Sequence, residues 1–157
     1  MKISLFYIGK TDLEYLRTGI QVYNSRIGHY IPFELVELSD IKNTKNLSEL
    51  QQKEKEGELI LSKIDKTKFL ILLDEKGKEY SSEQFSVFLE TKMIAASPDI
   101  IFLIGGAYGF SQKVYERANF KIALSKMTFS HQMVRLIFIE QLYRALTIMR
   151  GEPYHHK

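Results

Sequence analysis

Two short apolar runs constrain the fold of this chain more than any other feature. KFLILLD spans residues 68–74 and DIIFLI spans residues 99–104. A strand with one wet face alternates apolar and polar residues, whereas a near-continuous run is typical of a strand buried on both faces. KISLFYI at residues 2–8 and FKIALS at 120–125 are similar, and PFELVEL at 32–38 alternates. These five segments predict a mainly parallel sheet that helices cover on both sides.

Helical patterns separate the predicted strands. Thr11 and Glu14 fit a capping box for a helix over 12–26, and Ser81 and Ser82 are plausible caps for a helix that ends before Pro98. Further helices are predicted over 48–64, with a weak point at Gly57, and over 111–118 and 131–150. Residues 39–47 and the stretch EKGK at 75–78 are expected to be a loop and a turn. The predicted class is α/β, a mainly parallel sheet flanked by helices, in one domain over residues 1–157.

Composition excludes several classes of protein. The 157 residues include no cysteine, which rules out disulfides and cysteine metal sites. The N-terminus lacks the pattern of a signal peptide and no stretch is apolar enough to span a bilayer, so we expect a cytoplasmic protein without a membrane partner. The net charge of +3 permits a nucleic-acid partner but does not require one.

The carboxyl ends of the buried strands are the expected place for a ligand. One such end carries Leu73, and another carries GGAYG at 105–109. The glycines do not have the GxGxxG spacing of dinucleotide sites, and the chain contains no GxxxxGK followed by Ser or Thr. Gly105 and Gly106 would let a ligand approach the backbone closely. The alternative is a tight turn between strand and helix, which the spacing alone favours.

A third strand end runs into SKMTFSHQ, at residues 125–132. Its hydroxyl groups and apolar side chains suit a loop that holds an aromatic ring through backbone hydrogen bonds. Ser130 is also placed to cap the following helix. Taken alone, a loop followed by a cap is the simpler interpretation.

The predicted helix over 131–150 is apolar on most sides, so most of its surface has to be covered. A twofold homodimer would cover it, and a fully buried central helix is the alternative. Glu140 and Arg144 are four residues apart and can pair. Arg135 lies in the first turns, where a cation is unfavourable for the helix dipole, which hints at an anionic partner.

The chain ends in GEPYHHK, residues 151–157. An aromatic ring and basic groups on a tail suit stacking on an unpaired base and contact with phosphates. A frayed terminus is the alternative. Adjacent histidines point apart on an extended tail and no carboxylate or cysteine cluster accompanies them, so we expect no metal site.

Three segments together resemble the RlmH family of SPOUT-class methyltransferases, which modify a pseudouridine in large-subunit ribosomal RNA. These are FLIGGAYGF, ALSKMTFSHQMVRLIFIEQLYRA and IMRGEPYHHK, and the resemblance covers the whole chain. It implies a SPOUT-type fold with a C-terminal deep trefoil knot, S-adenosyl-L-methionine as cofactor, a homodimer, and ribosomal RNA within the ribosome or large subunit as substrate. We expect no DNA partner. The chain has Ala107 and Ser130 where relatives often have proline, which puts the loop shape in doubt.

The resemblance also implies site residues. The expected cofactor contacts are Leu73, Gly105, Gly106, Ser125, Lys126, Met127, Thr128, Phe129 and Ser130. His155 is the first candidate for the base that takes the N3 proton and Glu140 the second, with Arg144 and Tyr154 beside them in the catalytic group; solvent is the alternative acceptor. The expected RNA contacts are Arg135, Arg144, Tyr154, His155, His156 and Lys157. We hypothesise that one protomer holds the cofactor while the other supplies these groups.

Two other functions stay open at this level. A non-catalytic ribosome- or RNA-binding protein with a vestigial cofactor pocket would have the same segments. A small hydrolase is disfavoured because the chain has neither a GxSxG nucleophile elbow nor a cysteine.

Overall fold

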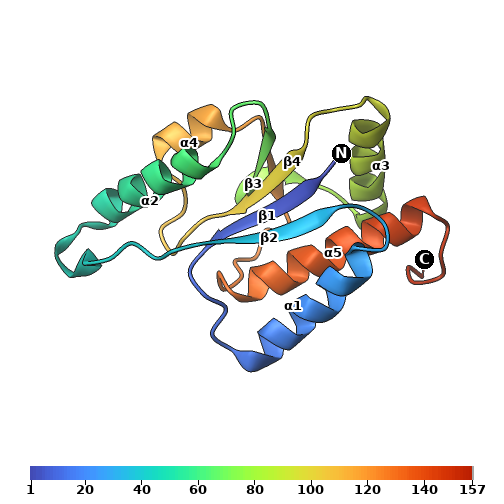
Figure 1. Cartoon of the computed structure of the whole chain (residues 1–157), viewed down its shortest axis with the longest axis horizontal. Helices are drawn as coiled ribbons and strands as arrows, with labels where there is room; N and C mark the ends of the chain where they lie inside the picture. Colours follow the sequence, from blue (N-terminus) through green and yellow to red (C-terminus); the bar gives the residue numbers. More distant parts are fainter. Residues whose placement is uncertain (157) are drawn as a thin grey trace.

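The computed structural model describes residues 1–156, in which five strands form one parallel sheet (Figure 1). The order across the sheet is β2-β1-β4-β3-β5. The strands are β1 (Ile3–Ile8), β2 (Phe33–Leu38), β3 (Phe69–Glu79), β4 (Ile100–Ile104) and β5 (Phe120–Ala123). The parallel arrangement predicted from the apolar runs is confirmed.

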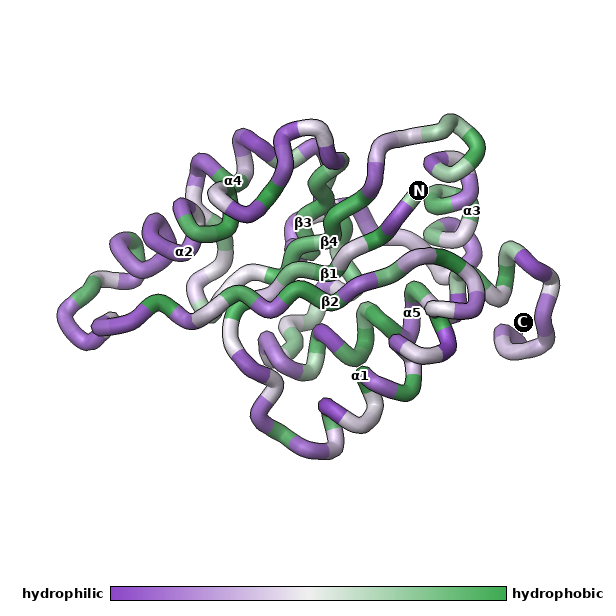
Figure 2. The backbone as a smooth tube through the Cα atoms, in the orientation of Figure 1, coloured by the Kyte–Doolittle hydropathy of each residue, from purple (hydrophilic) through white to green (hydrophobic). Residues whose placement is uncertain are grey.

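The helices lie in two layers on opposite faces of the sheet (Figures 1 and 2). One layer holds α1 (Glu14–Ile27), α3 (Ser82–Ile94) and α5 (Met133–Met149). The other holds α2 (Glu49–Lys63) and α4 (Gln112–Arg117), and a short 3-10 turn, η1 (Thr44–Asn46), precedes α2. Apolar side chains of α1, α3 and α5 pack in the core on one face of the sheet, and those of α2 and α4 pack in the core on the other face.

The central strand β4 shows why the apolar runs are continuous. Ile100, Phe102 and Ile104 pack into the core beneath α1, α3 and α5. Ile101 and Leu103 point the other way, into the core beneath α2 and α4. Successive side chains of a strand alternate between faces, so two covered faces require an apolar residue at every position.

The predicted start of the first helix is wrong. The residue preceding α1 is Leu13, and no side chain caps this end. The hydroxyl of Thr11 instead accepts a hydrogen bond from the guanidinium of Arg135, 2.8 Å away. Thr11 is therefore bonded to a residue distant in sequence, although the local pattern predicted that it would cap the helix. The capping at Ser81 is confirmed: its hydroxyl accepts from the backbone N–H of Gln84.

The predicted turn at EKGK is also wrong, because β3 continues through it to Glu79. The strand bulges after Leu73 and pairs again at Lys78, opposite Ile122 of β5. A Cβ atom at Gly77 would lie 2.6 Å from the backbone nitrogen of Ile122. Glycine at this position lets β5 approach closely, which the local turn signal did not reveal.

The long C-terminal helix α5 is the middle helix of its layer, packed between α1 and α3. Its buried residues include Phe138, Ile139 and Leu142. Burial by its neighbours accounts for much of its apolar surface, as the alternative of a central helix requires. The hydroxyl of Ser130 accepts from the backbone N–H of Met133, which confirms the predicted contact at the helix start. No helix among residues 1–156 has the length and hydropathy needed to cross a membrane.

Candidate functional site

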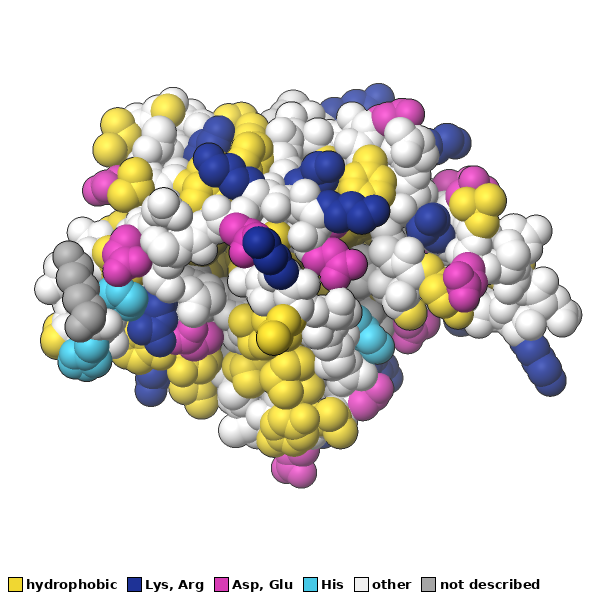
Figure 3. All heavy atoms as spheres, turned by 180° about the vertical axis from the view of Figure 1, so that it is seen from behind, with side chains coloured by type: hydrophobic (Ala, Val, Ile, Leu, Met, Phe, Trp, Pro, Cys, Tyr) yellow, Lys and Arg dark blue, Asp and Glu magenta, His cyan; other side chains and the backbone are white. Residues whose placement is uncertain are grey.

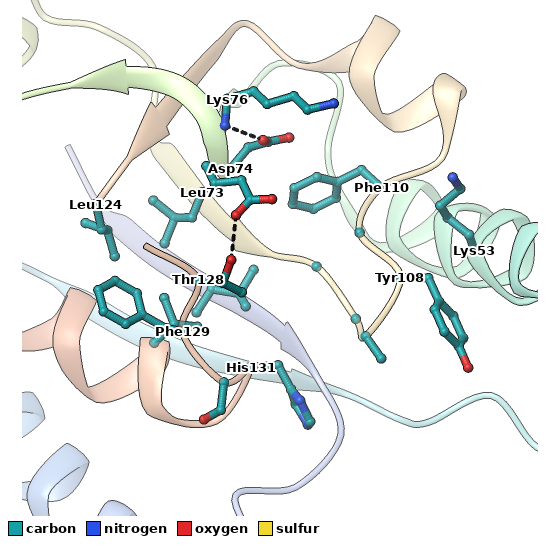
Figure 4. Close-up of a pocket in the computed structure, with 18 of the residues that line it drawn as sticks. Lys53, Leu73, Asp74, Lys76, Tyr108, Phe110, Leu124, Thr128, Phe129 and His131 are labelled. Atoms are coloured by element: carbon teal, nitrogen blue, oxygen red, sulfur yellow. Dashed lines mark hydrogen bonds between the residues drawn. The ribbon is translucent and has the colours of Figure 1, made fainter. Parts of the chain in front are cut away.

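A cavity of about 860 Å³ opens where the bulge of β3 and the carboxyl ends of β4 and β5 meet the start of α5 (Figure 4). Three segments form most of its wall: 73–76 in the bulge of β3, 104–110 after β4, and 124–131 after β5. The sequence pointed to these three places as strand ends, and the first of them is a bulge within β3. Their convergence follows from topology, because parallel strands present their carboxyl ends at one edge of the sheet.

The glycines after β4 form a tight turn that is also part of the cavity wall. The backbone N–H of Gly109 donates to the carbonyl of Gly106 at 3.1 Å, and Gly109 has a φ of +82°. A Cβ atom at Gly105 would meet the ring of Phe110 at 3.1 Å. The sequence left two interpretations open, a tight turn and a surface that a ligand approaches. The structure has a tight turn that also lines the cavity.

The segment after β5 folds back over the cavity through short-range contacts. The hydroxyl of Ser125 accepts from the backbone N–H of Met127 at 2.9 Å, and the hydroxyl of Thr128 donates to Glu75 at 2.9 Å. The second contact closes one side of the cavity, between two of its connecting segments (Figure 4). Phe129 supplies an apolar surface from the same segment.

Eight of the nine expected cofactor contacts line the cavity: Leu73, Gly105, Gly106, Ser125, Met127, Thr128, Phe129 and Ser130. Lys126 does not, since its side chain is 87% exposed and lies 3.9 Å from Glu79. The ammonium group of Lys126 points to solvent, and Met127 beside it is also largely exposed although it lines the cavity.

Several lining residues are not among the expected cofactor contacts. Asp74 follows Leu73 and accepts a hydrogen bond from the hydroxyl of Tyr115, and burial together with this carboxylate raises the pKa of Tyr115. Lys53 reaches the cavity from α2, where it lies beside Tyr108 (Figure 4). Lys53 had no local signal, because only the packing of α2 against the sheet brings it to the site.

The lining suits a nucleoside that carries a charged amino-acid group. A cavity of this volume is within the range of small-molecule sites. Leu73, Leu124 and Phe129 offer apolar contact for an aromatic ring, and the glycine turn leaves backbone groups accessible. Lys53 and Lys76 provide cations, and Asp74 and Glu75 provide carboxylates. Both charges of an amino acid therefore have partners, so the residues fit S-adenosylmethionine.

The second group of expected site residues forms a cluster at the other end of α5. Arg144 donates to Glu140 at 2.5 Å and contacts Nδ1 of His155 at 3.2 Å. Tyr154 donates to Glu140 at 2.9 Å, and its ring lies against Tyr143 with 4.7 Å between ring centroids. The tail is thus docked on α5 through residue 155, which differs from a frayed terminus.

Comparison with known proteins identifies the family. Residues 1–155 match the family model described as a predicted SPOUT methyltransferase. Proteins named ribosomal RNA large subunit methyltransferase H are similar along all 157 residues and over their own full length. Those from Parabacteroides distasonis, Flavobacterium johnsoniae and Christiangramia forsetii are 60%, 59% and 57% identical. The chain belongs to the SPOUT methyltransferase family.

In this SPOUT methyltransferase the hydrogen bonds of His155 fix its tautomer. A guanidinium group only donates, so Nδ1 of His155 accepts from Arg144. Nε2 then carries the proton and donates to Glu83 at 3.0 Å. Glu140 is similarly occupied, since it accepts from Arg144, Tyr154 and Gln141. His155 and Glu140, the two candidate bases, both accept hydrogen bonds from neighbouring donors. Neither residue therefore has a free basic atom in this arrangement.

The cluster and the cavity are separated along α5. Val134 lines the cavity, and Arg144 lies ten residues further on, which is about 15 Å at the α-helical rise. Within one chain, the SPOUT methyltransferase therefore keeps its expected cofactor contacts and its tail cluster apart. His156 is exposed beyond the cluster, and Lys157 lies outside the described residues.

Arg135 does not lie where an RNA contact requires it. Its side chain is only 1% exposed, and its guanidinium donates to the hydroxyl of Thr11 and to the carbonyl of Ile8. It also stacks over the ring of Tyr7, 4.2 Å from the centroid. Arg135 was expected to contact RNA, and this expectation is corrected. The residue is buried, and it links the start of α5 to the end of β1. Among the described residues no group of three acidic, histidine or cysteine side chains is placed to hold a metal ion.

Proposed function

We propose that this chain is an S-adenosylmethionine-dependent methyltransferase that modifies N3 of a pseudouridine in large-subunit ribosomal RNA. The observation that carries the proposal is the cavity at the carboxyl edge of the sheet, walled by three connecting segments of a SPOUT methyltransferase. The relatives named for the ribosomal RNA large subunit support the substrate. We propose that the protein acts in the cytoplasm on the ribosome or its large subunit.

The cofactor would be held by backbone groups and apolar side chains of the three segments. When bound, S-adenosylmethionine supplies a methyl group that its sulfonium already activates. The residues of the chain then have to bind, orient and exclude water, since aligning two reactants lowers the barrier without further chemical assistance. The hydrogen bond between Thr128 and Glu75 would keep the wall in place around the cofactor. The C-terminal knot of the SPOUT class stays a prediction.

The imide nitrogen of the acceptor has to lose a proton during transfer. His155 and Glu140 are saturated by hydrogen bonds, so we propose that the tail cluster holds RNA and that the proton passes to solvent. Arg144 and Tyr154 would contact phosphate and base, as expected from the sequence. Such contacts orient the target base more than they change its chemistry.

The active site is proposed to be composite, with the cavity of one protomer and the tail cluster of its partner in a homodimer. The separation of the two groups along α5 supports sharing between protomers. Figure 3 shows apolar side chains gathered on the lower part of the molecule, where α1 and α5 lie. Exposed apolar residues near the start of α1 include Leu13 and Tyr15, which suit a buried interface between copies.

The proposal is tested by binding and by product analysis. Calorimetry should give saturable S-adenosylmethionine binding that Ala107→Trp abolishes, because Ala107 lines the cavity and an indole ring there would take up space that the cofactor needs. Val87→Trp on the exposed side of α3 is the matched control and should bind normally. Mass spectrometry of ribosomal RNA from a strain lacking the gene should show one missing methyl group on a pseudouridine, restored by the protein. Binding to ribosomes without cofactor binding or methylation would favour a non-catalytic RNA-binding protein instead.

A further inference from the structure

A buried carboxylate, that of Glu56 on α2, lies behind the glycine turn that lines the expected cofactor cavity. Its side chain is 4% exposed and faces Gly106. A Cβ atom on that glycine would lie 2.5 Å from Oε2, 2.9 Å from Cδ and 2.9 Å from Oε1. Gly106 is part of the cavity lining and Glu56 is not. The backbone at Gly106, which has no side chain, therefore lies between this carboxylate and a ligand in the cavity.

The hydrogen bonds of Glu56 leave one of its two oxygens unused. Oε1 accepts from the side-chain amide of Gln52 at 3.2 Å, whereas Oε2 has no hydrogen-bond partner among the described residues. A buried polar atom without a partner costs free energy, and native proteins contain few of them. The fold by itself therefore supplies only part of what this carboxylate needs.

No cation compensates the charge of Glu56 within residues 1–156. The ion pairs in this part of the chain do not include it, and Lys53, three residues earlier on α2, lines the cavity without pairing with it. Asp40, an ionisable neighbour that perturbs it, is itself acidic. Burial, and to a lesser extent Asp40, raises the pKa of Glu56. A buried carboxylate without a positive partner is costly, so a cation bound nearby would stabilise its charged form.

The methyl donor and the product that it leaves behind differ in charge. S-adenosylmethionine has a positive sulfonium group in addition to the two opposite charges of its amino-acid part. S-adenosylhomocysteine has a neutral thioether in place of the sulfonium. A negative charge in surroundings of low dielectric constant acts over several ångströms, so it does not need direct contact with the cation. A carboxylate behind Gly106 would therefore favour binding of the charged donor over binding of the neutral product.

We propose that Glu56 is a specificity-determining residue whose carboxylate acts across the backbone of Gly106 and makes the cavity prefer the positively charged methyl donor to its neutral product. This inference rests on the proposed function and names the residue that selects its cofactor. The same charge promotes release of the product, because Glu56 loses its positive partner once the methyl group has left the sulfonium. Glycine at 106 suits this role, since a side chain there would displace the carboxylate.

Calorimetry with three ligands tests the proposal. The ligands are S-adenosylmethionine, S-adenosylhomocysteine and sinefungin, in which a carbon that bears an ammonium group replaces the methylated sulfur. We expect Glu56→Gln to raise the Kd of the two charged ligands about tenfold, and to change the Kd of S-adenosylhomocysteine less than about twofold, because the amide keeps the shape and removes the charge. Glu54→Gln removes a carboxylate from the exposed side of α2 and is the matched control, which should bind all three ligands as the wild type does.

The ratio of the Kd values for product and donor decides the outcome. A partly unfolded variant weakens all ligands by the same factor, so the ratio stays interpretable even if Glu56→Gln lowers stability. Glu56→Asp retains the charge and should retain the preference for the charged ligands, although its shorter side chain can weaken all three.

Two results would overturn the proposal. A ratio in Glu56→Gln equal to that of the wild type would show that the charge does not act on the ligand. An equal loss of preference in Glu56→Asp and Glu56→Gln would assign the effect to the shape of the turn. Failure of the proposed function is distinct, because wild-type protein would then bind neither S-adenosylmethionine nor S-adenosylhomocysteine, or would bind them without methylating ribosomes.

Discussion

At Gly106, a Cβ atom would lie 2.5 Å from Oε2 of Glu56, a carboxylate that is 4% exposed. Burial raises the pKa of Glu56, and its Oε2 has no hydrogen-bond partner. Glu56, rather than a ligand in the cavity, therefore excludes a side chain at Gly106.

Gly106→Ala should consequently lower the free energy of unfolding by about 1–2 kcal/mol, because the confined carboxylate has to move. In a Glu56→Ala background the same substitution should cost almost nothing. Urea unfolding of the four proteins measures this coupling. An equal cost in both backgrounds would show that Glu56 is not the cause, and cofactor titration of the stable variants would then test the cavity side.

At the scale of elements, α2 and α4 cross at Gly57, which is buried. Helix propensity alone predicts that Gly57→Ala stabilises the chain by up to about 1 kcal/mol. The structure predicts the opposite sign, because the new Cβ would lie 2.3 Å from the hydroxyl oxygen of Ser111. We expect a loss of about 1–3 kcal/mol in unfolding free energy.

Ser111→Gly removes the obstructing side chain at the cost of a cap worth a few tenths of a kcal/mol. Gly57→Ala combined with Ser111→Gly should therefore be more stable than Gly57→Ala alone. A stabilising effect of Gly57→Ala by itself would contradict the close helix crossing.

The contact between the docked tail and Glu83 makes the stability of the fold depend on pH. The hydrogen bond from His155 lowers the pKa of Glu83 to about 2, from a usual value of 4.5. A carboxyl group with a lowered pKa stabilises the folded state above the pKa of the unfolded chain, and the contribution disappears as the pH falls toward the folded value.

The difference in stability between wild type and Glu83→Gln should therefore be constant above about pH 5 and shrink from about pH 4.5 toward pH 2. Unfolding by urea across this pH range measures it. Glu90→Gln should show no such trend, and a difference that grows in acid would rule out the contact between Glu83 and the tail.

At the scale of the whole molecule, the composite site makes a prediction about mixed dimers. Ala107→Trp should inactivate the cavity, and His155→Ala should inactivate the tail cluster while leaving Tyr154 packed on Tyr143. Co-refolding the two inactive proteins should restore up to about a quarter of the wild-type activity, since half of the dimers are mixed and each has one intact site.

The measurement is methylation of ribosomes by the mixture, with each variant alone as the control. Activity that stays at the sum of the single variants would show that each protomer works by itself. Sedimentation of the wild type should give a dimer, and a monomer at working concentration would contradict sharing independently.

Local sequence signals predicted the elements well where one residue pattern had one physical cause. The continuous apolar runs at β3 and β4 reported burial on two faces, and Ser81 reported a helix start. They failed where a residue distant in sequence was the actual partner. Thr11 accepts a hydrogen bond from Arg135 instead of capping α1, and Gly77 allows β5 to approach closely instead of forming a turn. The burial of Arg135 had no local signal, because its hydroxyl and carbonyl partners are more than one hundred residues away.

By itself the sequence determined a parallel α/β sheet, three strand ends as candidate ligand contacts, and a family, because apolar periodicity and motif order are properties of the chain. Only the tertiary structure decided that Lys53 and Asp74 join the cavity, that Lys126 points away, and that His155 and Glu140 are saturated. It also revealed a second cavity, at the carboxyl ends of β1 and β2, which shares His131 with the first. These facts depend on which side chains meet across the sheet edge, and such meetings are fixed by packing between segments remote in sequence rather than by any local pattern.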